Sequence, residues 1–136
     1  MCTEPFDPWE TVADDARLSL TTARLPDGMA GATDGAGRIW LDDRLTATER
    51  RCVLTHELVH IEAGHHGHQT ETVEAWVREQ TARRLIPLEA LQPWRSWQGT
   101  LWQLADELGV THDVLLDRLR TASAGERSVL RLRGEG

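Results

Sequence analysis

The sequence predicts a single α+β domain: a short antiparallel or mixed sheet packed on one long helix, followed by a C-terminal helical hairpin. Three observations support this prediction. Residues 17–23 and 37–41 have the patterns of short strands, residues 46–64 carry the start and stop signals of a helix, and residues 101–119 hold two short helical segments around Gly109. With 136 residues, the chain is long enough for one domain and too short for two of ordinary size.

The remaining segments are less regular. Residues 1–15 are acidic and hold two prolines, which favours a loose arm or a short first helix. Residues 26–37 are rich in Gly, Asp and Pro and are expected to form a loop. A second helix is expected over residues 70–86, because Pro87 cannot continue it.

Residues 46–64 show both ends of the first long helix. Thr46 and Glu49 form a capping box, in which each side chain covers a backbone N–H that the first turn leaves unpaired. Gly64 stands where a left-handed glycine commonly ends a helix. Between these ends, one apolar stripe is expected to bury against the rest of the domain, formed by Leu54, Leu58 and Ile61.

The same helix carries an H-E-x-x-H motif over residues 56–60. His56 and His60 are four residues apart, so both imidazoles lie on one face of the helix and can bind a single zinc ion. Glu57, beside them, has the position of a general base that takes a proton from water. The pattern is typical of zinc peptidases and predicts a catalytic metal site.

A catalytic zinc site usually takes three ligands from the protein, and two residues compete for the third place. Glu74 falls on the apolar stripe of the second helix, where a carboxylate is costly to bury unless it is paired or bound to a metal. His66 ends the longer pattern H-E-x-x-H-x-x-G-x-x-H, but Ala63 occupies its glycine position and no methionine follows the motif. The residues therefore favour Glu74 and leave His66 as the alternative.

Several neighbours are expected to support this site. Glu71, one turn before Glu74, is a candidate hydrogen-bond partner for a ligand histidine. Residues 38–41 form either a plain sheet strand or an edge strand that holds an extended peptide through main-chain hydrogen bonds. The histidines after Gly64 are expected in a mobile polar loop, namely His65, His66 and His68. The chain has no tyrosine, and the candidates for a second oxyanion donor are His112, His66 and Arg78.

Further segments accompany the motif: Glu49-Arg50-Arg51 before it, residues 74–77, and residues 82–87. With them the chain resembles the ImmA/IrrE family of metallopeptidases over residues 36–90. In that family a glutamate ahead of a helix end of this kind is the third zinc ligand, and Glu74 holds that position. The resemblance therefore implies zinc bound by His56, His60 and Glu74.

The resemblance also implies a small zincin-like fold of the gluzincin type and a zinc-dependent endopeptidase with Glu57 as its general base. Family members cleave or antagonise helix-turn-helix repressors of phages and mobile elements, or act in the control of stress responses. A protein or peptide substrate, such as a repressor of this kind, is therefore the partner expected in the bacterial cytoplasm. The sequence does not predict the oligomeric state.

The rival reading is a regulatory DNA- or protein-binding module with a structural zinc site. Residues 105–115 match the spacing of a helix-turn-helix, but the second helix carries Asp113 and Asp117 and few donors for bases or phosphates. We therefore expect residues 1–92 to form a peptidase core and residues 93–136 a helical extension packed on it. Two residue sets could serve a partner: a basic patch of Arg118, Arg120, Arg127, Arg131 and Arg133, and a surface of Trp94, Trp97 and Trp102.

Composition argues against several other functional classes, namely nucleic-acid-binding, membrane and secreted proteins. The formal net charge of −7 argues against general affinity for nucleic acid or anionic membranes. No apolar run is long enough to cross a bilayer, and the N-terminus lacks the pattern of a signal peptide. Two cysteines form no disulfide framework, which fits the cytoplasm. The six tryptophans are expected to serve mainly as core anchors.

Overall fold

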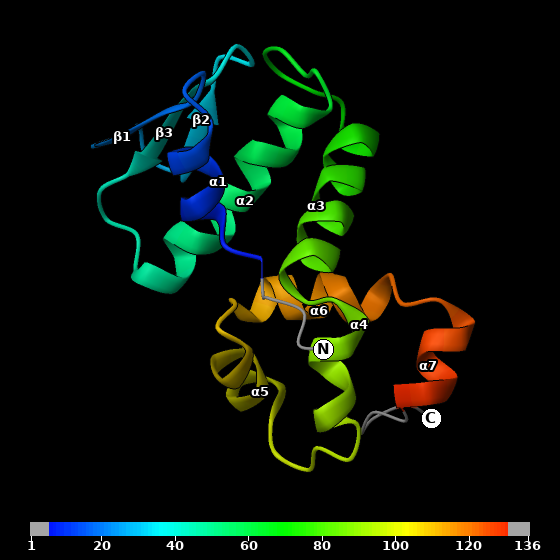
Figure 1. Ribbon diagram of the computed structural model, residues 1–136. Coiled ribbons are helices and arrows are strands. Elements are labelled where there is room, and N and C mark those ends of the chain that lie inside the picture. The colour runs from blue at the N-terminus through cyan, green and yellow to red at the C-terminus, as the bar shows by residue number, and fades with distance from the viewer. Residues whose placement is uncertain (1–5, 131–136) are drawn as a thin grey trace.

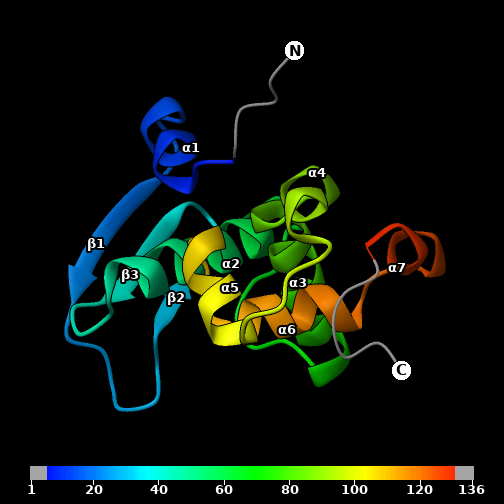
Figure 2. The same ribbon diagram turned by 90° about the horizontal axis from the view of Figure 1, so that it is seen from below.

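A computed structural model describes residues 6–130, and within this range the chain has the predicted α+β architecture (Figure 1). A three-stranded mixed sheet and helices α1 and α2 lie at one end, and α4 to α7 gather at the other. Helix α3 runs beside α2 and reaches from the first group to the second. Viewed from below, the sheet and α7 stand at opposite sides of the molecule (Figure 2).

The sheet has the order β1-β3-β2, with β1 at Ser19–Ala23, β2 at Gly31–Thr33 and β3 at Arg38–Asp42. Strand β3 pairs in parallel with β1 and antiparallel with β2. Strands β1 and β3 match the two predicted strands. The prediction of an uninterrupted loop over 26–37 is wrong, because this segment contains β2. Three residues are too few to show an alternating pattern, and β2 is a strand only through its pairing with β3.

The N-terminal segment forms a short helix, α1 (Pro8–Asp14), rather than a loose arm. Asp7 caps it by accepting hydrogen bonds from the N–H groups of Trp9 and Glu10. Pro8 suits the first turn because its missing N–H would have no partner there. Residues 1–5 of the predicted segment lie outside the described residues.

Helix α2 (Ala47–Glu62) begins with the predicted capping box. The Thr46 N–H donates to Glu49 Oε1 at 2.8 Å, and the Glu49 N–H donates to Thr46 Oγ1 at 3.1 Å. Gly64 follows the helix at φ +76°, a backbone conformation that is strained for any residue with a side chain. Both predicted ends of the helix are confirmed.

Helix α3 (Glu71–Leu85) is capped by the Thr70 hydroxyl and ends just before Pro87, as predicted. The short helix α4 (Leu88–Leu91) and the 3-10 helix η1 (Gln92–Trp94) follow it. The predicted hairpin consists of α5 (Leu101–Leu108) and α6 (His112–Arg120), joined at Gly109 with φ +70°. Helix α7 (Ala124–Leu130) completes the described chain.

Two apolar clusters hold these layers together, and α2 contributes to both. The first lies between α2 and the sheet and is built on Ile39, Leu41, Leu54 and Leu58. The second joins α2 and α3 to the C-terminal helices and is built on Cys52, Leu85, Ile86, Leu91, Leu104, Ala105, Val110 and Leu115. The hairpin therefore packs on the rest of the protein, and the division at residues 92 and 93 stays a prediction.

The expected basic patch is wrong, and the expected role of the tryptophans is met only in part. Arg118 is 1% exposed and donates to the Ile86 carbonyl and to Glu126, so it cannot contribute to a basic patch. Arg131 and Arg133 of that patch lie outside the described residues. None of the six tryptophans is fully buried, and Trp102 is 66% exposed. Trp94 and Trp97 are partly buried against the second cluster, so the expectation of core anchors is met in part by these two and is wrong for the exposed Trp9, Trp76 and Trp102. Over residues 6–130, every helix is too short or too polar to cross a membrane.

Candidate metal centre

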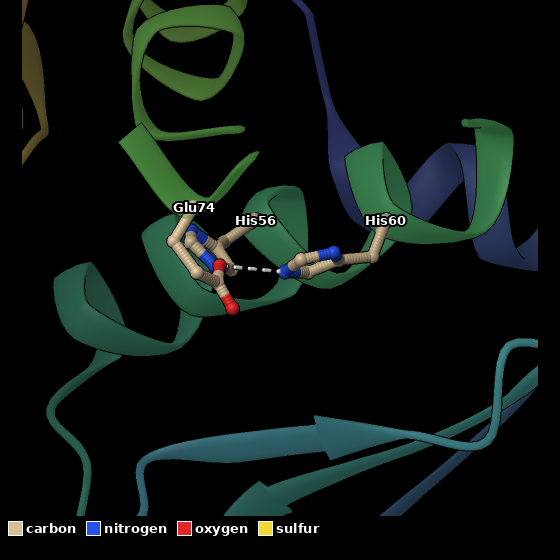
Figure 3. A group of neighbouring side chains, drawn as sticks. All are labelled: His56, His60 and Glu74. Carbon is tan, nitrogen blue, oxygen red and sulfur yellow. Dashed lines mark hydrogen bonds and ion pairs between the residues drawn. The ribbon is translucent and has the colours of Figure 1, made fainter. Parts of the chain in front are cut away.

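Three side chains that the sequence singles out for a metal meet between α2 and α3 (Figure 3). His56 and His60 stand one turn apart on α2, and Glu74 comes from the first turn of α3. Glu74 Oε1 lies 3.0 Å from His60 Nε2 and 3.4 Å from His56 Nε2. The donor atoms lie within 4.8 Å of one another, and the described part of the chain holds one such group of His, Cys, Asp or Glu.

The two helices bring these groups together by their local sequence. Leu54 and Leu58 bury one face of α2 against the sheet, which leaves the adjacent face with its histidines turned toward α3. Glu74 lies in the first turn of α3, where the partial positive charge of the helix N-terminus favours a carboxylate. The carboxylate thus faces the histidine pair across the contact between the helices.

The donor set fits a zinc ion. Zinc bound tetrahedrally to imidazole nitrogen and carboxylate oxygen at about 2.0–2.2 Å sets its ligand atoms about 3.4 Å apart. Both distances measured from Glu74 Oε1 are close to this spacing. Burial, with a smaller effect of His60, lowers the pKa of His56 and favours the neutral imidazole that binds a metal.

Glu57 has an unusual environment for a carboxyl group. It is 8% exposed, and within residues 6–130 no hydrogen-bond donor reaches it. Burial, and to a lesser extent the charge of Glu74, raises the pKa of Glu57 to about 7. A carboxyl group with a pKa near neutrality can take a proton from water and release it again in a later step.

The predicted role of Glu71 is wrong. Its side chain is 81% exposed, and its Oε1 lies 2.6 Å from Arg78 Nη2 rather than near a histidine. Seven residues are two helical turns, so the two side chains share one face of α3 and their opposite charges attract. The partner of a motif histidine is instead His65, whose Nδ1 lies 3.0 Å from His60 Nδ1. Sequence reasoning missed this contact, and its only signal was the nearness of His65 to the motif.

His66, the alternative third ligand, is exposed and does not belong to the group of donors. Among the oxyanion candidates, His112 stacks on Trp102 in the C-terminal layer, with 3.7 Å between ring centroids. Arg78 lies near enough to the site for its charge to lower the pKa of His56. Of these three candidates, Arg78 is the one whose charge acts on His56, and its guanidinium is paired with Glu71.

Strand β2, rather than β3, is the sheet edge beside the motif helix. Residues 38–41 lie in the centre of the sheet, so the reading of this segment as an edge strand is wrong. The Asp42 N–H donates to the Ala30 carbonyl and the Asp34 N–H to the Arg38 carbonyl. In an antiparallel ladder, this alternation turns the main-chain groups of Gly31 and Thr33 away from β3.

Gly31 explains how this edge lies so close to the site. A Cβ atom there would stand 2.5 Å from Val53 Cγ1 and 3.6 Å from Glu57 Cγ. A residue with a side chain would therefore push β2 away from α2. Sequence reasoning missed this role, because Gly31 lies in a segment where glycine is equally expected in a turn.

Comparison with known proteins adds one finding. A family model described as the IrrE N-terminal-like domain, a peptidase family, matches residues 13–120. Neither the comparison with curated proteins nor the comparison with solved structures returned a match. The matched range includes both long helices, the sheet and the C-terminal hairpin.

Proposed function

Because the chain belongs to the family of the IrrE N-terminal-like domain, we propose that it is a zinc-dependent endopeptidase of the ImmA/IrrE type. A peptidase family implies protein or peptide substrates. The observation that carries the proposal is the meeting of His56, His60 and Glu74 beside the buried carboxyl group of Glu57.

In this proposal His56, His60 and Glu74 hold the ion, which supplies Lewis acidity to water and to a peptide carbonyl when it is bound. Glu57 accepts a proton from the water molecule as the water oxygen bonds to the carbonyl carbon. The C–N bond then breaks, and Glu57 gives its proton to the leaving nitrogen. The absence of a competing hydrogen bond, among the described residues, leaves the Glu57 carboxylate free for both transfers.

The substrate lies as an extended segment against β2. Support comes from the main-chain groups of Gly31 and Thr33, which face away from β3 and can pair with a peptide strand. The close approach of Gly31 to Glu57 would set that peptide beside the general base. Arg78 is the proposed second donor to the developing oxyanion, on the basis of its electrostatic effect at His56.

A helix-turn-helix repressor in the bacterial cytoplasm stays the predicted substrate, on the family resemblance alone. The alternative of a DNA-binding module draws no support from α6. Its Arg118 is buried and paired, and Leu115 of the same helix packs into the second cluster. A buried general base such as Glu57 has no purpose in a purely structural zinc site.

The proposal is tested by metal analysis and hydrolysis together. Wild-type protein loaded with zinc is expected to bind about one ion per chain and to cleave members of a pool of quenched fluorogenic peptides. A chelator should remove the activity and zinc should restore it. Glu74→Ala is expected to lose both zinc and cleavage, whereas the matched loop variant His66→Ala keeps both. Zinc lost only from His66→Ala, or zinc-loaded wild type that cleaves no peptide in the pool, contradicts the proposal.

A further inference from the structure

The loop after α2 supplies a side chain to the side of His60 that faces away from Glu74. His60 Nε2 lies 3.0 Å from Glu74 Oε1, and His60 Nδ1 lies 3.0 Å from His65 Nδ1 (Figure 3 shows one nitrogen of His60 turned toward Glu74 and the other farther from it). We propose that His65 is a positioning residue that fixes the tautomer and the orientation of His60. This inference rests on the ligand set of the proposed function.

The chemistry of the contact between His60 and His65 determines which ring donates the hydrogen bond. Two imidazole nitrogens at hydrogen-bond distance need one proton between them, carried by one ring and accepted by the other. If Nε2 of His60 binds a cation through its lone pair, neutral His60 must carry its proton on Nδ1. His60 Nδ1 therefore donates, His65 Nδ1 accepts, and neutral His65 carries its own proton on Nε2.

His65 can act in this way because its surroundings hold it on several sides. Its backbone N–H donates to the His60 carbonyl at 3.0 Å, which ties the loop to the end of α2. Its ring meets Trp76 of α3 edge-on, with 6.1 Å between ring centroids. The turn before β3 also packs closely on it, since a Cβ atom at Gly35 would lie 2.5 Å from the His65 carbonyl oxygen.

These contacts separate the proposed role from a role in folding. The backbone hydrogen bond to His60 forms with any residue other than proline at position 65, so a substitution leaves the end of α2 in place. The side-chain bond, by contrast, acts only on the orientation of the His60 ring. Loss of such an outer partner commonly weakens metal binding about 10- to 100-fold.

The test measures the zinc dissociation constant of the full chain by competition with a chromophoric chelator, beside the melting temperature of the metal-free protein. His65→Phe keeps a ring against Trp76 but removes the acceptor, and it should weaken zinc binding about 10- to 100-fold. His65→Asn restores an acceptor near the position of Nδ1 and should recover most of the affinity. The visible spectrum of the cobalt-substituted protein should change in His65→Phe and return toward wild type in His65→Asn.

His68 provides the matched control, because it is exposed in the same loop. His68→Phe and His68→Asn should bind zinc as wild type does. Wild-type affinity in His65→Phe overturns the inference while leaving the proposed function intact, and wild-type protein that binds no zinc overturns both. If phenylalanine unfolds the loop, His65→Ala and His65→Asn decide the question, since both lack the ring and only asparagine keeps an acceptor. Equal zinc affinity in that pair overturns the inference.

Discussion

Two buried ionisable side chains, one at each end of the molecule, differ in how the protein surrounds them. Arg118 on α6 is 1% exposed, and its guanidinium donates to the Ile86 carbonyl at 2.6 Å and to Glu126 Oε2 at 2.6 Å. Glu57 on α2 is 8% exposed, and no donor among residues 6–130 reaches its carboxylate. Burial of an ionised group is costly unless partners compensate it. The paired charge therefore stabilises the fold, whereas the unpaired carboxyl marks the place where chemistry is expected.

The largest expected effect concerns the unpaired group. Glu57→Gln should reduce kcat/KM for peptide hydrolysis about 100- to 10,000-fold, because the amide cannot accept the proton from water. Zinc content should stay at the wild-type level, since the proposed ligands are unchanged. The melting temperature of the metal-free protein should hold or rise, because the substitution removes an uncompensated buried carboxyl group. A fully active Glu57→Gln protein would rule out the proposed mechanism.

Substitution of the paired Arg118 should instead reduce stability. Arg118→Met should lower the free energy of unfolding by about 3–5 kcal/mol, because Glu126 and the Ile86 carbonyl lose a buried donor. Denaturant titration measures this loss. Arg120→Met on the same helix is the control: its side chain is 67% exposed, and the expected change is within about 0.5 kcal/mol. Equal stability of the two variants would show that the Arg118 pairing does not support the fold.

The third prediction concerns the contact between the sheet edge and the motif helix. Gly31→Ala should cost about 1–3 kcal/mol of stability, because its Cβ would overlap Val53 Cγ1. It should also raise KM for peptides if the substrate pairs with β2. Gly125→Ala on α7 is the control. Its Cβ would meet only Ser123 Oγ at 3.9 Å, and the alanine should stabilise the helix by about 0.4–1 kcal/mol. Unchanged melting in Gly31→Ala would mean that β2 can shift freely.

The smallest expected effect is a change of stability with pH that depends on Glu126 and appears only in acid. Its hydrogen bond with Arg118, followed by one from the Ser123 N–H, lowers the pKa of this carboxyl from 4.5 to about 2 in the folded protein. The interaction therefore stabilises the fold fully above pH 4.5 and is lost as pH falls from 4.5 toward 2. Melting temperatures of wild type should fall more steeply across this window than those of Glu126→Gln, and parallel curves would contradict the prediction.

The parts of the fold that could be predicted are those that depend on local signals in the sequence. The capping box of Thr46 and Glu49, the stop at Pro87 and the left-handed Gly109 each act within one or two turns of chain, so they can be recognised without a structure. The position of Glu74 followed from helical spacing. Its approach to His56 and His60 is now visible in the structure, while its role as a zinc ligand stays a proposal.

The features that were missed depend on partners far away in the chain or on competition between neighbours. Strand β2 exists through its pairing with β3, and nothing in its three residues marks it. Glu71 was expected near a histidine, but the nearby charge of Arg78 draws it outward. His65 looked like any polar loop residue, because the contact with His60 depends on how the chain turns after Gly64. Such choices are made by tertiary packing, which helical periodicity does not encode.

The edge of the sheet at β2 has a consequence for the behaviour of the protein in concentrated solution. A strand that can pair with a foreign peptide can also pair with another copy of itself, and long exposed edges promote aggregation for this reason. With only Gly31–Thr33 in β2, a second copy finds few hydrogen bonds to form. If the substrate pairs with β2 as proposed, the shortness of this strand allows brief docking of a peptide while it discourages growth into fibrils through β2.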